Sequence, residues 1–198
     1  MVNETATAAS QSKAIHSGIA ESVRASVNAK VIGRGECDRR HNLLVANTAV
    51  GIGSRNGGKK GEMYIGNMRV RLGDGLICTP DIVIVANDPN FSTAAEEELV
   101  NPTVIIDVFS SRSDSLEKTR KLESFLATDS IKECLLVKQD EMRVEHYARQ
   151  NQKQWIYRIY NEKDDVISID AAGCKISMQE IYAKVDLARA QFASRSLN

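Results

Sequence analysis

The sequence has no excess of charge of either sign, because 26 Lys and Arg residues are balanced by 26 Asp and Glu residues. A protein without net charge attracts a polyanion through a local patch rather than through its overall field. The balance therefore disfavours a protein that coats DNA without specificity.

Segments that would take a protein into or across a membrane are also missing. The first ten residues contain neither a basic stretch nor an apolar run, and no stretch of the chain is apolar for long enough to cross a bilayer. We expect a soluble, cytoplasmic protein.

Cysteine and histidine are scarce and scattered. The four cysteines form no Cys-x-x-Cys pair, and none of His16, His41 and His146 stands at zinc-finger spacing from them. This excludes the common structural zinc patterns and gives no sign of a disulfide framework. Cys78 and Cys134 lie in strand-like runs, and we interpret them as small buried hydrophobic residues.

The length of 198 residues, with 42% hydrophobic content, is enough for one core of ordinary size. Residues 1–27 are rich in Ala, Ser, Thr and Asn and show weak periodicity, which is typical of a poorly ordered tail. We therefore expect one domain over residues 28–190, with residues 191–198 as a C-terminal tail.

The first half of the domain contains a helix and a hairpin in our reading. Apolar residues recur at helical spacing over residues 41–52, where Gly51 and Gly53 close the helix. Residues 63–72 and 76–86 read as two strands joined by a glycine-rich turn.

The second half alternates strands and helices. Residues 103–110 form an apolar strand, and a helix with an apolar stripe follows, with Asp114 and Glu117 as a capping box. The remaining elements are strands over residues 133–138, 143–150, 155–160 and 166–169, and a final helix over residues 177–187. This order predicts an α/β fold, a mixed β-sheet flanked by helices.

Two acidic residues interrupt buried strands. Asp81 follows Pro80 at the start of one apolar run, and Asp107 lies within the run of residues 104–109. A carboxylate in such a place is desolvated unless it meets a cation or hydrogen-bond donors. A single loop separates the two strands, so the acids can meet and share a magnesium ion, which asks for one or two carboxylates.

A lysine close behind completes the pattern of a metal-dependent nuclease. Lys121 lies on the helix that follows the second acid, and a compact ammonium group suits the positioning of water or phosphate. We prefer it to Lys118 and Arg120 because it borders the apolar stripe. Glu117 stands four residues earlier on the same side, as a further metal ligand or as the salt-bridge partner of Lys121.

Each of these residues also has a simpler interpretation. A Pro-Asp pair is common turn chemistry, a helix lysine is usually solvated, and a helix-start histidine such as His41 usually makes a surface hydrogen bond. The glycine-rich loop of residues 55–61 lacks the spacing of a phosphate-binding P-loop. We expect Trp155 and Tyr157 to pack on the sheet, and we expect solvation rather than DNA contact for Arg39, Arg40, Arg55, Lys59 and Lys60.

Several segments together resemble the Uma-type putative restriction endonuclease family of the PD-(D/E)xK nuclease superfamily. The matching segments are residues 79–85, 101–110, 133–137 and 144–147, together with Lys121. The likeness covers about residues 41 to 185. It implies a restriction-endonuclease-like core, a divalent metal ion (Mg²⁺ or Mn²⁺) and a DNA substrate.

The resemblance also assigns residues. Asp81 matches the family's Pro-Asp acid, Asp107 its strand acid, Lys121 its helix lysine and His41 its helix-start histidine. The family usually has Glu at the position of Asp107 and an acid where this chain has Lys30. With one carboxylate fewer, we expect weak activity with magnesium and better activity with manganese.

The sequence thus favours a DNA endonuclease that uses Asp81 and Asp107 as metal ligands and Lys121 to position water. One alternative is a weakened homologue that acts as a nucleic-acid-binding or interaction module, and another is a structural scaffold. A homodimer would suit cleavage of both strands.

Overall fold

The centre of the fold is a six-stranded mixed β-sheet. The computed structural model describes residues 38–55, 61–92, 95–111 and 115–187, all within the unit that spans Gly35–Asn198. The helices are α2 (Arg39–Gly53), α3 (Ser115–Ala127) and α4 (Met178–Ile181). The strands are β1 (Glu62–Ile65), β2 (Arg69–Arg71), β3 (Ile77–Cys78), β4 (Ile82–Val85), β5 (Glu98–Leu99), β6 (Val104–Phe109), β7 (Glu133–Lys138), β8 (Val144–Arg149), β9 (Trp155–Tyr160), β10 (Val166–Ile169) and β11 (Cys174–Ser177).

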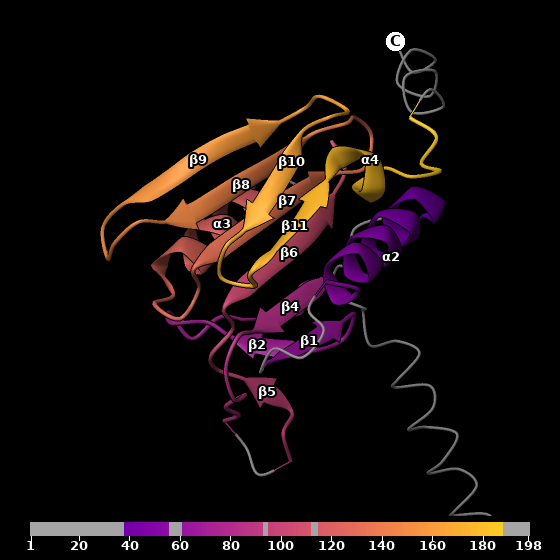
Figure 1. The fold of residues 1–198 in the computed structure, drawn as a ribbon. Coiled ribbons are helices and arrows are strands. Elements are labelled where there is room, and N and C mark those ends of the chain that lie inside the picture. The colour runs from indigo at the N-terminus through magenta and orange to yellow at the C-terminus, as the bar shows by residue number, and fades with distance from the viewer. Residues whose placement is uncertain (1–37, 56–60, 93–94, 112–114, 188–198) are drawn as a thin grey trace, which may run out of the picture. The chain divides into compact units, whose positions relative to one another are not determined.

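The strand order of the main sheet is β1-β4-β6-β7-β8-β9 (Figure 1). Within this sheet only β6 and β7 are parallel, and α3 forms the crossover that a parallel pair requires. The other pairs are antiparallel. The predicted α/β class with a mixed, helix-flanked sheet is confirmed.

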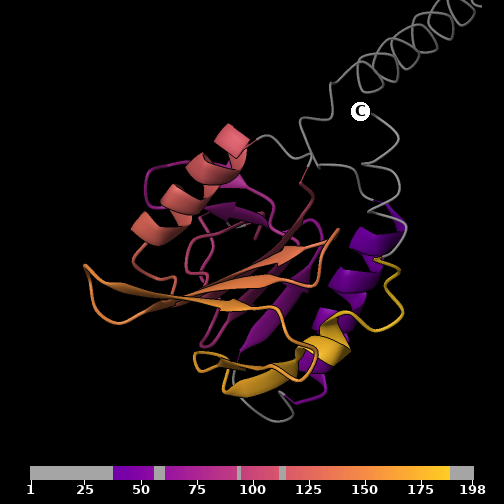
Figure 2. The ribbon, with the colours of Figure 1, turned by 90° about the horizontal axis from the view of Figure 1, so that it is seen from above.

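Helices cover both faces of the main sheet. Figure 2 shows α3 on one face and α2, α4 and the β10–β11 hairpin on the other. Phe125 of α3 packs in one apolar cluster, and Leu44 and Ile52 of α2 pack in the other. The strand β4 is buried along its whole length because both clusters use it. This explains why its sequence is a continuous apolar run.

The predicted hairpin over residues 63–86 is correct at its turn but wrong in its continuity. The turn closes with hydrogen bonds from the N–H of Leu72 to the carbonyl of Leu76 and from the N–H of Gly75 to the carbonyl of Leu72, and Gly75 takes the left-handed φ of 85° that such a turn requires. Each long strand is nevertheless broken in two. Gly66, with φ 94°, marks the bend, so β1 pairs with β4 while β2 joins β3 and β5 in a separate sheet.

The C-terminal helix predicted over residues 177–187 is also wrong. The chain there first forms β11, and α4 is a single turn that begins with a capping box between Ser177 and Glu180. Lys184 then takes a left-handed φ of 60°, which ends helical structure.

The predicted strands over residues 103–110, 133–138, 143–150, 155–160 and 166–169 are confirmed, as is the helix over residues 41–52. The capping residue Asp114, the basic residues Lys59 and Lys60, Lys30 and both predicted tails lie outside the described residues. Among the helices that are described, none is both long enough and apolar enough to cross a membrane.

Candidate active site

Asp81 joins three elements of the fold. It is buried at the entrance to β4, and its Oδ2 accepts a hydrogen bond of 2.8 Å from the backbone N–H of Val108 in β6. The Nε2 atom of His41, at the start of α2, lies 3.1 Å from its Oδ1 and 3.2 Å from its Oδ2. These contacts fix the carboxylate against both the sheet and the helix.

Asp107 lies next to Asp81, as the sequence predicts from the single loop between their strands. Its Oδ1 accepts a hydrogen bond of 3.2 Å from the backbone N–H of Asp81. Burial raises the pKa of Asp107, and the charge of Asp81 adds to that effect while the charge of Lys121 opposes it. A carboxylate of this kind gains from a nearby cation.

Lys121 supplies a cation at the other oxygen of Asp107, Oδ2. It lies on the second turn of α3, and its Nζ donates a hydrogen bond to Asp107 Oδ2. Burial alone would lower the pKa of Lys121, but the charge of Asp107 and this hydrogen bond raise it above its ordinary value. The lysine is therefore charged and is held over the second acid.

Lys118 and Glu117 take other positions, and Arg120 is exposed. Lys118 lies 3.8 Å from Glu145 and covers the ring of Phe109, so it faces β8 rather than Asp107. Glu117 is exposed in the first turn of α3, and the acid that pairs with Lys121 is Asp107. The geometry thus brings together Asp81, Asp107 and Lys121 without Glu117.

His41 is buried rather than at the surface, so its predicted surface hydrogen bond is wrong. Asp38 caps the helix by accepting from the backbone N–H groups of Arg40 and His41, and this turns the imidazole inward to Asp81. The Nδ1 atom of His41 is buried and has no hydrogen-bond partner among the described residues. The sequence pointed to His41 only as a histidine at the start of a helix, and nothing in the pattern showed that its side chain is buried against Asp81.

The donor set fits magnesium or manganese better than zinc. No group of three or more His, Cys, Asp or Glu residues gathers at metal-binding distance in the part of the chain that the structure describes. Structural zinc needs four such ligands, whereas magnesium takes one or two carboxylates together with water and substrate phosphate. Asp81 and Asp107 meet that smaller demand.

The cysteines near the site are not reactive thiols. Burial raises the pKa of Cys78 to about 12 and also raises that of Cys134. Cys134 is buried, as predicted, whereas Cys78 is only partly so. Both thiols are therefore neutral at ordinary pH.

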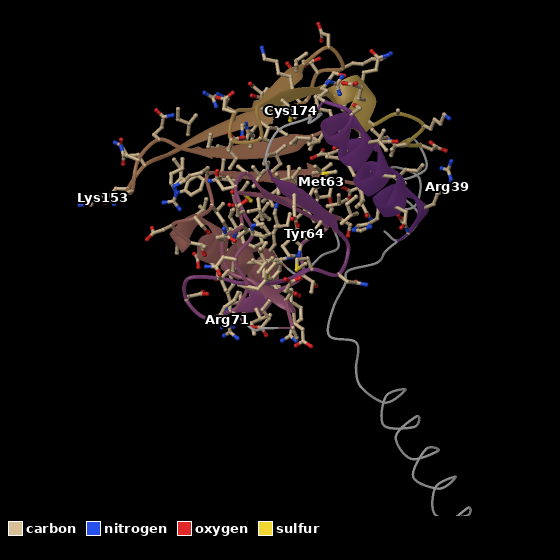
Figure 3. The ribbon with its side chains drawn as sticks, turned by 60° about the horizontal axis from the view of Figure 1, so that its bottom comes forward. Arg39, Met63, Tyr64, Arg71, Lys153 and Cys174 are labelled. Carbon is tan, nitrogen blue, oxygen red and sulfur yellow. The ribbon has the colours of Figure 1, made fainter. Side chains whose placement is uncertain are left out.

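Several of the other basic residues have structural partners. Arg40 forms an ion pair with Asp38 at 3.1 Å, and Arg55 forms one with Glu180 at 2.5 Å. Figure 3 shows Arg39 at the start of α2, with Lys153 at the tip of the β8–β9 hairpin.

Comparison with known proteins gives a family and a fold. Residues 34–179 match the sequence profile of the Uma2 family, described as putative restriction endonucleases. An uncharacterized protein of Synechocystis sp. (strain ATCC 27184 / PCC 6803 / Kazusa) is 26% identical over 117 residues, which are 59% of this chain and 66% of that protein. The crystal structure of a putative nuclease belonging to DUF820, from Anabaena variabilis ATCC 29413, superposes with a TM-score of 0.62 and 16% identity. That superposition covers 79% of this chain and 87% of the other. At this identity the superposition shows the likeness of the folds.

Proposed function

This chain belongs to the Uma2 family of putative restriction endonucleases, and from that premise we propose that it is a metal-dependent endonuclease that hydrolyses phosphodiester bonds of DNA. The observation that carries the proposal is that one buried carboxylate, one partly buried carboxylate and a charged lysine meet at adjacent strands. The backbone N–H of Asp81 donates a hydrogen bond of 3.2 Å to Oδ1 of Asp107, and Nζ of Lys121 donates to the other oxygen of Asp107.

In this proposal Asp81 and Asp107 hold a magnesium or manganese ion. When bound there, such an ion would supply Lewis-acid chemistry for phosphodiester hydrolysis, by activating water and by stabilising negative charge on the phosphate. Lys121 places a second positive charge beside Asp107, where it can orient the attacking water or the scissile phosphate.

His41 acts as a positioning residue in the same proposal. Its imidazole and the N–H of Val108 hold the carboxylate of Asp81, so the acid does not need to reorganise when it binds a cation. A ligand held in this way binds metal more tightly than a mobile one.

A second candidate function is a weakened nuclease that binds nucleic acid. The observation that favours it is Lys30, which stands where the resembling family has an acid. A site with one carboxylate fewer should bind magnesium weakly and work better with manganese.

Cleavage of supercoiled plasmid tests the proposal. The wild-type protein should nick or linearise the plasmid with manganese and more slowly with magnesium, and a chelator should stop it. Asp107→Ala should be inactive in both metals, whereas Asp88→Ala, at an exposed aspartate, should cleave like wild type. Metal-dependent cleavage by Asp107→Ala at the wild-type rate would show that another site does the chemistry.

A further inference from the structure

The sheet face that carries Asp107 continues across the sheet to its edge. Asp107 pairs with Leu136 of β7, Leu136 pairs with Glu145 of β8, and Glu145 pairs with Ile159 of β9. Residues that are direct partners across neighbouring strands point to the same side. The β8–β9 hairpin therefore extends the site's own face to the edge strand β9, where Tyr157 and Ile159 are 47% and 42% exposed.

Aromatic residues concentrate on this hairpin. The chain has one tryptophan and five tyrosines, and Trp155, Tyr147, Tyr157 and Tyr160 all lie on β8 or β9. The rings of Tyr147 and Tyr157 are stacked, with centroids 4.8 Å apart. Because β9 is the edge strand, Tyr147 covers Tyr157 from the inner side of the sheet, and the half-exposed ring of Tyr157 offers its outer side to a further flat group.

The hairpin is also basic in a chain without net charge. Between residues 143 and 160 there are four basic residues, Arg143, Arg149, Lys153 and Arg158, and one acid, Glu145. The side chain of Glu145 is enclosed by donors, since Arg143 lies 3.3 Å and Lys118 lies 3.8 Å from it. Without Arg158, which lies on the opposite face of β9, basic residues of the hairpin still outnumber its one acid, as a polyanion partner requires.

Cations connect this hairpin to the candidate active site. Lys121 binds Asp107, and one turn earlier on α3 the Nζ of Lys118 lies 3.6 Å from the centroid of the Phe109 ring. Arg143 follows on the far side of Glu145, and its Nη2 donates to the hydroxyl of Tyr157 at 3.4 Å. Lys121, Lys118 and Arg143 thus lead from the two acids to the exposed tyrosine.

Arg149 has a structural role in this hairpin. Its guanidinium donates to the backbone carbonyls of Leu126, Thr128 and Ile131, and it lies 4.3 Å from the centroid of the Trp155 ring. It ties the end of α3 to the hairpin and fixes Trp155 in place. Arg143 and Lys118 instead share the single acid Glu145, so they are the basic groups of this face that can meet a phosphate.

We propose that this face binds an unpaired DNA strand, with a base stacked on Tyr157 and the phosphates running past Arg143 and Lys118 toward Asp107. A base inside a duplex has both of its faces covered by neighbouring bases, whereas an unpaired base can stack on an aromatic ring. The inference rests on the proposed nuclease function and specifies its substrate as DNA that contains a single-stranded segment.

Binding of a fluorescently labelled oligo(dT) strand, measured by anisotropy in chelator, tests the inference without cleavage. The strand should bind more tightly than a blunt duplex of the same length and should quench the emission of Trp155, the single tryptophan. Tyr157→Ala should weaken binding about 5- to 150-fold, the range for loss of one stacked base, whereas Tyr157→Phe should keep most of it. Equal binding of strand and duplex, or unchanged binding by Tyr157→Ala, would overturn the inference.

A matched pair of arginines on the hairpin separates this face from general charge attraction. Arg143→Ala should weaken strand binding and reduce its salt dependence, whereas Arg158→Ala, at an exposed arginine on the opposite face of β9, should have little effect. Equal weakening by both variants would show diffuse attraction and overturn the inference. Thermal unfolding of each variant shows that the fold is retained, and should Tyr157→Ala unfold, the comparison of Arg143→Ala with Arg158→Ala still decides.

The outcomes distinguish this inference from the proposed function. If no DNA is cleaved but oligo(dT) binds through Tyr157, the binding face stands and the nuclease proposal fails. If plasmid is cleaved through Asp107 while Tyr157→Ala changes only the oligomeric state, measured by light scattering, the face is an interface between copies and the inference fails.

Discussion

Two buried histidine–carboxylate pairs in this protein have the same local geometry in different surroundings. His41 Nε2 lies 3.1 Å from Asp81, and His146 Nε2 lies 3.1 Å from Glu133. Among the described residues, the Nδ1 atom of each histidine is buried and has no partner. The pair itself therefore does not distinguish a functional site from a structural one.

The surroundings make the difference. The second oxygen of Glu133 accepts a hydrogen bond of 2.9 Å from the backbone N–H of Ala171, so this pair connects β7 and β8 to the β10–β11 hairpin. Asp81 instead has a second carboxylate, Asp107, beside it and the ammonium group of Lys121 beyond. We therefore base the proposed catalytic site on the convergence of two acids and a cation, rather than on the burial of one acid.

The largest expected effect is the difference between two matched amide substitutions, Asp81→Asn and Glu133→Gln. Asp81→Asn should lower the rate of metal-dependent DNA cleavage by about 10³-fold, because it removes a metal ligand from the site. Glu133→Gln should leave the rate unchanged and lower the free energy of unfolding by about 1–3 kcal/mol, because it disturbs a buried hydrogen-bonded acid. Plasmid cleavage and urea unfolding measure the two effects, and the reverse pattern would exchange the roles assigned to the two pairs.

The two lysines of α3 sharpen the comparison next. Lys121→Met should slow cleavage by about 10²-fold, since it removes the charge beside Asp107. Lys118→Met should weaken DNA binding while leaving the rate at saturating DNA near that of wild type, because its Nζ faces Phe109 and Glu145. Single-turnover kinetics over a range of DNA concentrations separate rate from affinity. If Lys118→Met lost the cleavage rate and Lys121→Met kept it, the assignment of Lys121 to the site would be wrong.

The ion pair between Asp107 and Lys121 should contribute little to the free energy of unfolding or even lower it. The double variant Asp107→Asn with Lys121→Met removes a half-buried ion pair without leaving either charge alone, so its free energy of unfolding should equal that of wild type or exceed it by about 1–4 kcal/mol. Lys121→Met alone should be less stable than the double variant, because it leaves the carboxylate of Asp107 desolvated without its cation. Urea unfolding in chelator measures this, and a double variant less stable than both single ones would contradict it.

The smallest expected effect is on pH dependence. Burial raises the pKa of Asp107, so cleavage should decrease as the pH falls through a range above that in which an ordinary aspartate is protonated. The sign for stability is opposite. A carboxyl whose folded pKa is raised stabilises the fold below its unfolded pKa, and this contribution is lost as the pH rises through the folded pKa. In chelator, wild type should therefore lose stability relative to Asp107→Asn over that rise in pH.

The parts of the fold that the sequence predicted correctly are those fixed by local patterns. The β-branched runs gave the central strands, and a single loop between two of them placed Asp81 beside Asp107. Helical periodicity then put Lys121 on the side of α3 that faces the sheet.

Features set by distant partners were missed. The bend at Gly66 depends on β1 and β2 joining different sheets, and β11 depends on pairing with β10. The inward turn of His41 depends on the cap at Asp38 and on the packing of α2 against the sheet. Local propensity carries little information on such choices, because tertiary contacts decide them.

The central claim is that Asp81 and Asp107 share one metal ion, and a calorimetric titration with manganese tests it most directly. Wild type and Glu133→Gln should bind the ion with equal affinity, whereas Asp81→Asn and Asp107→Asn should each lose that binding, because the claim is that these two acids share one metal. Equal manganese affinity in wild type, Asp81→Asn and Asp107→Asn would contradict it.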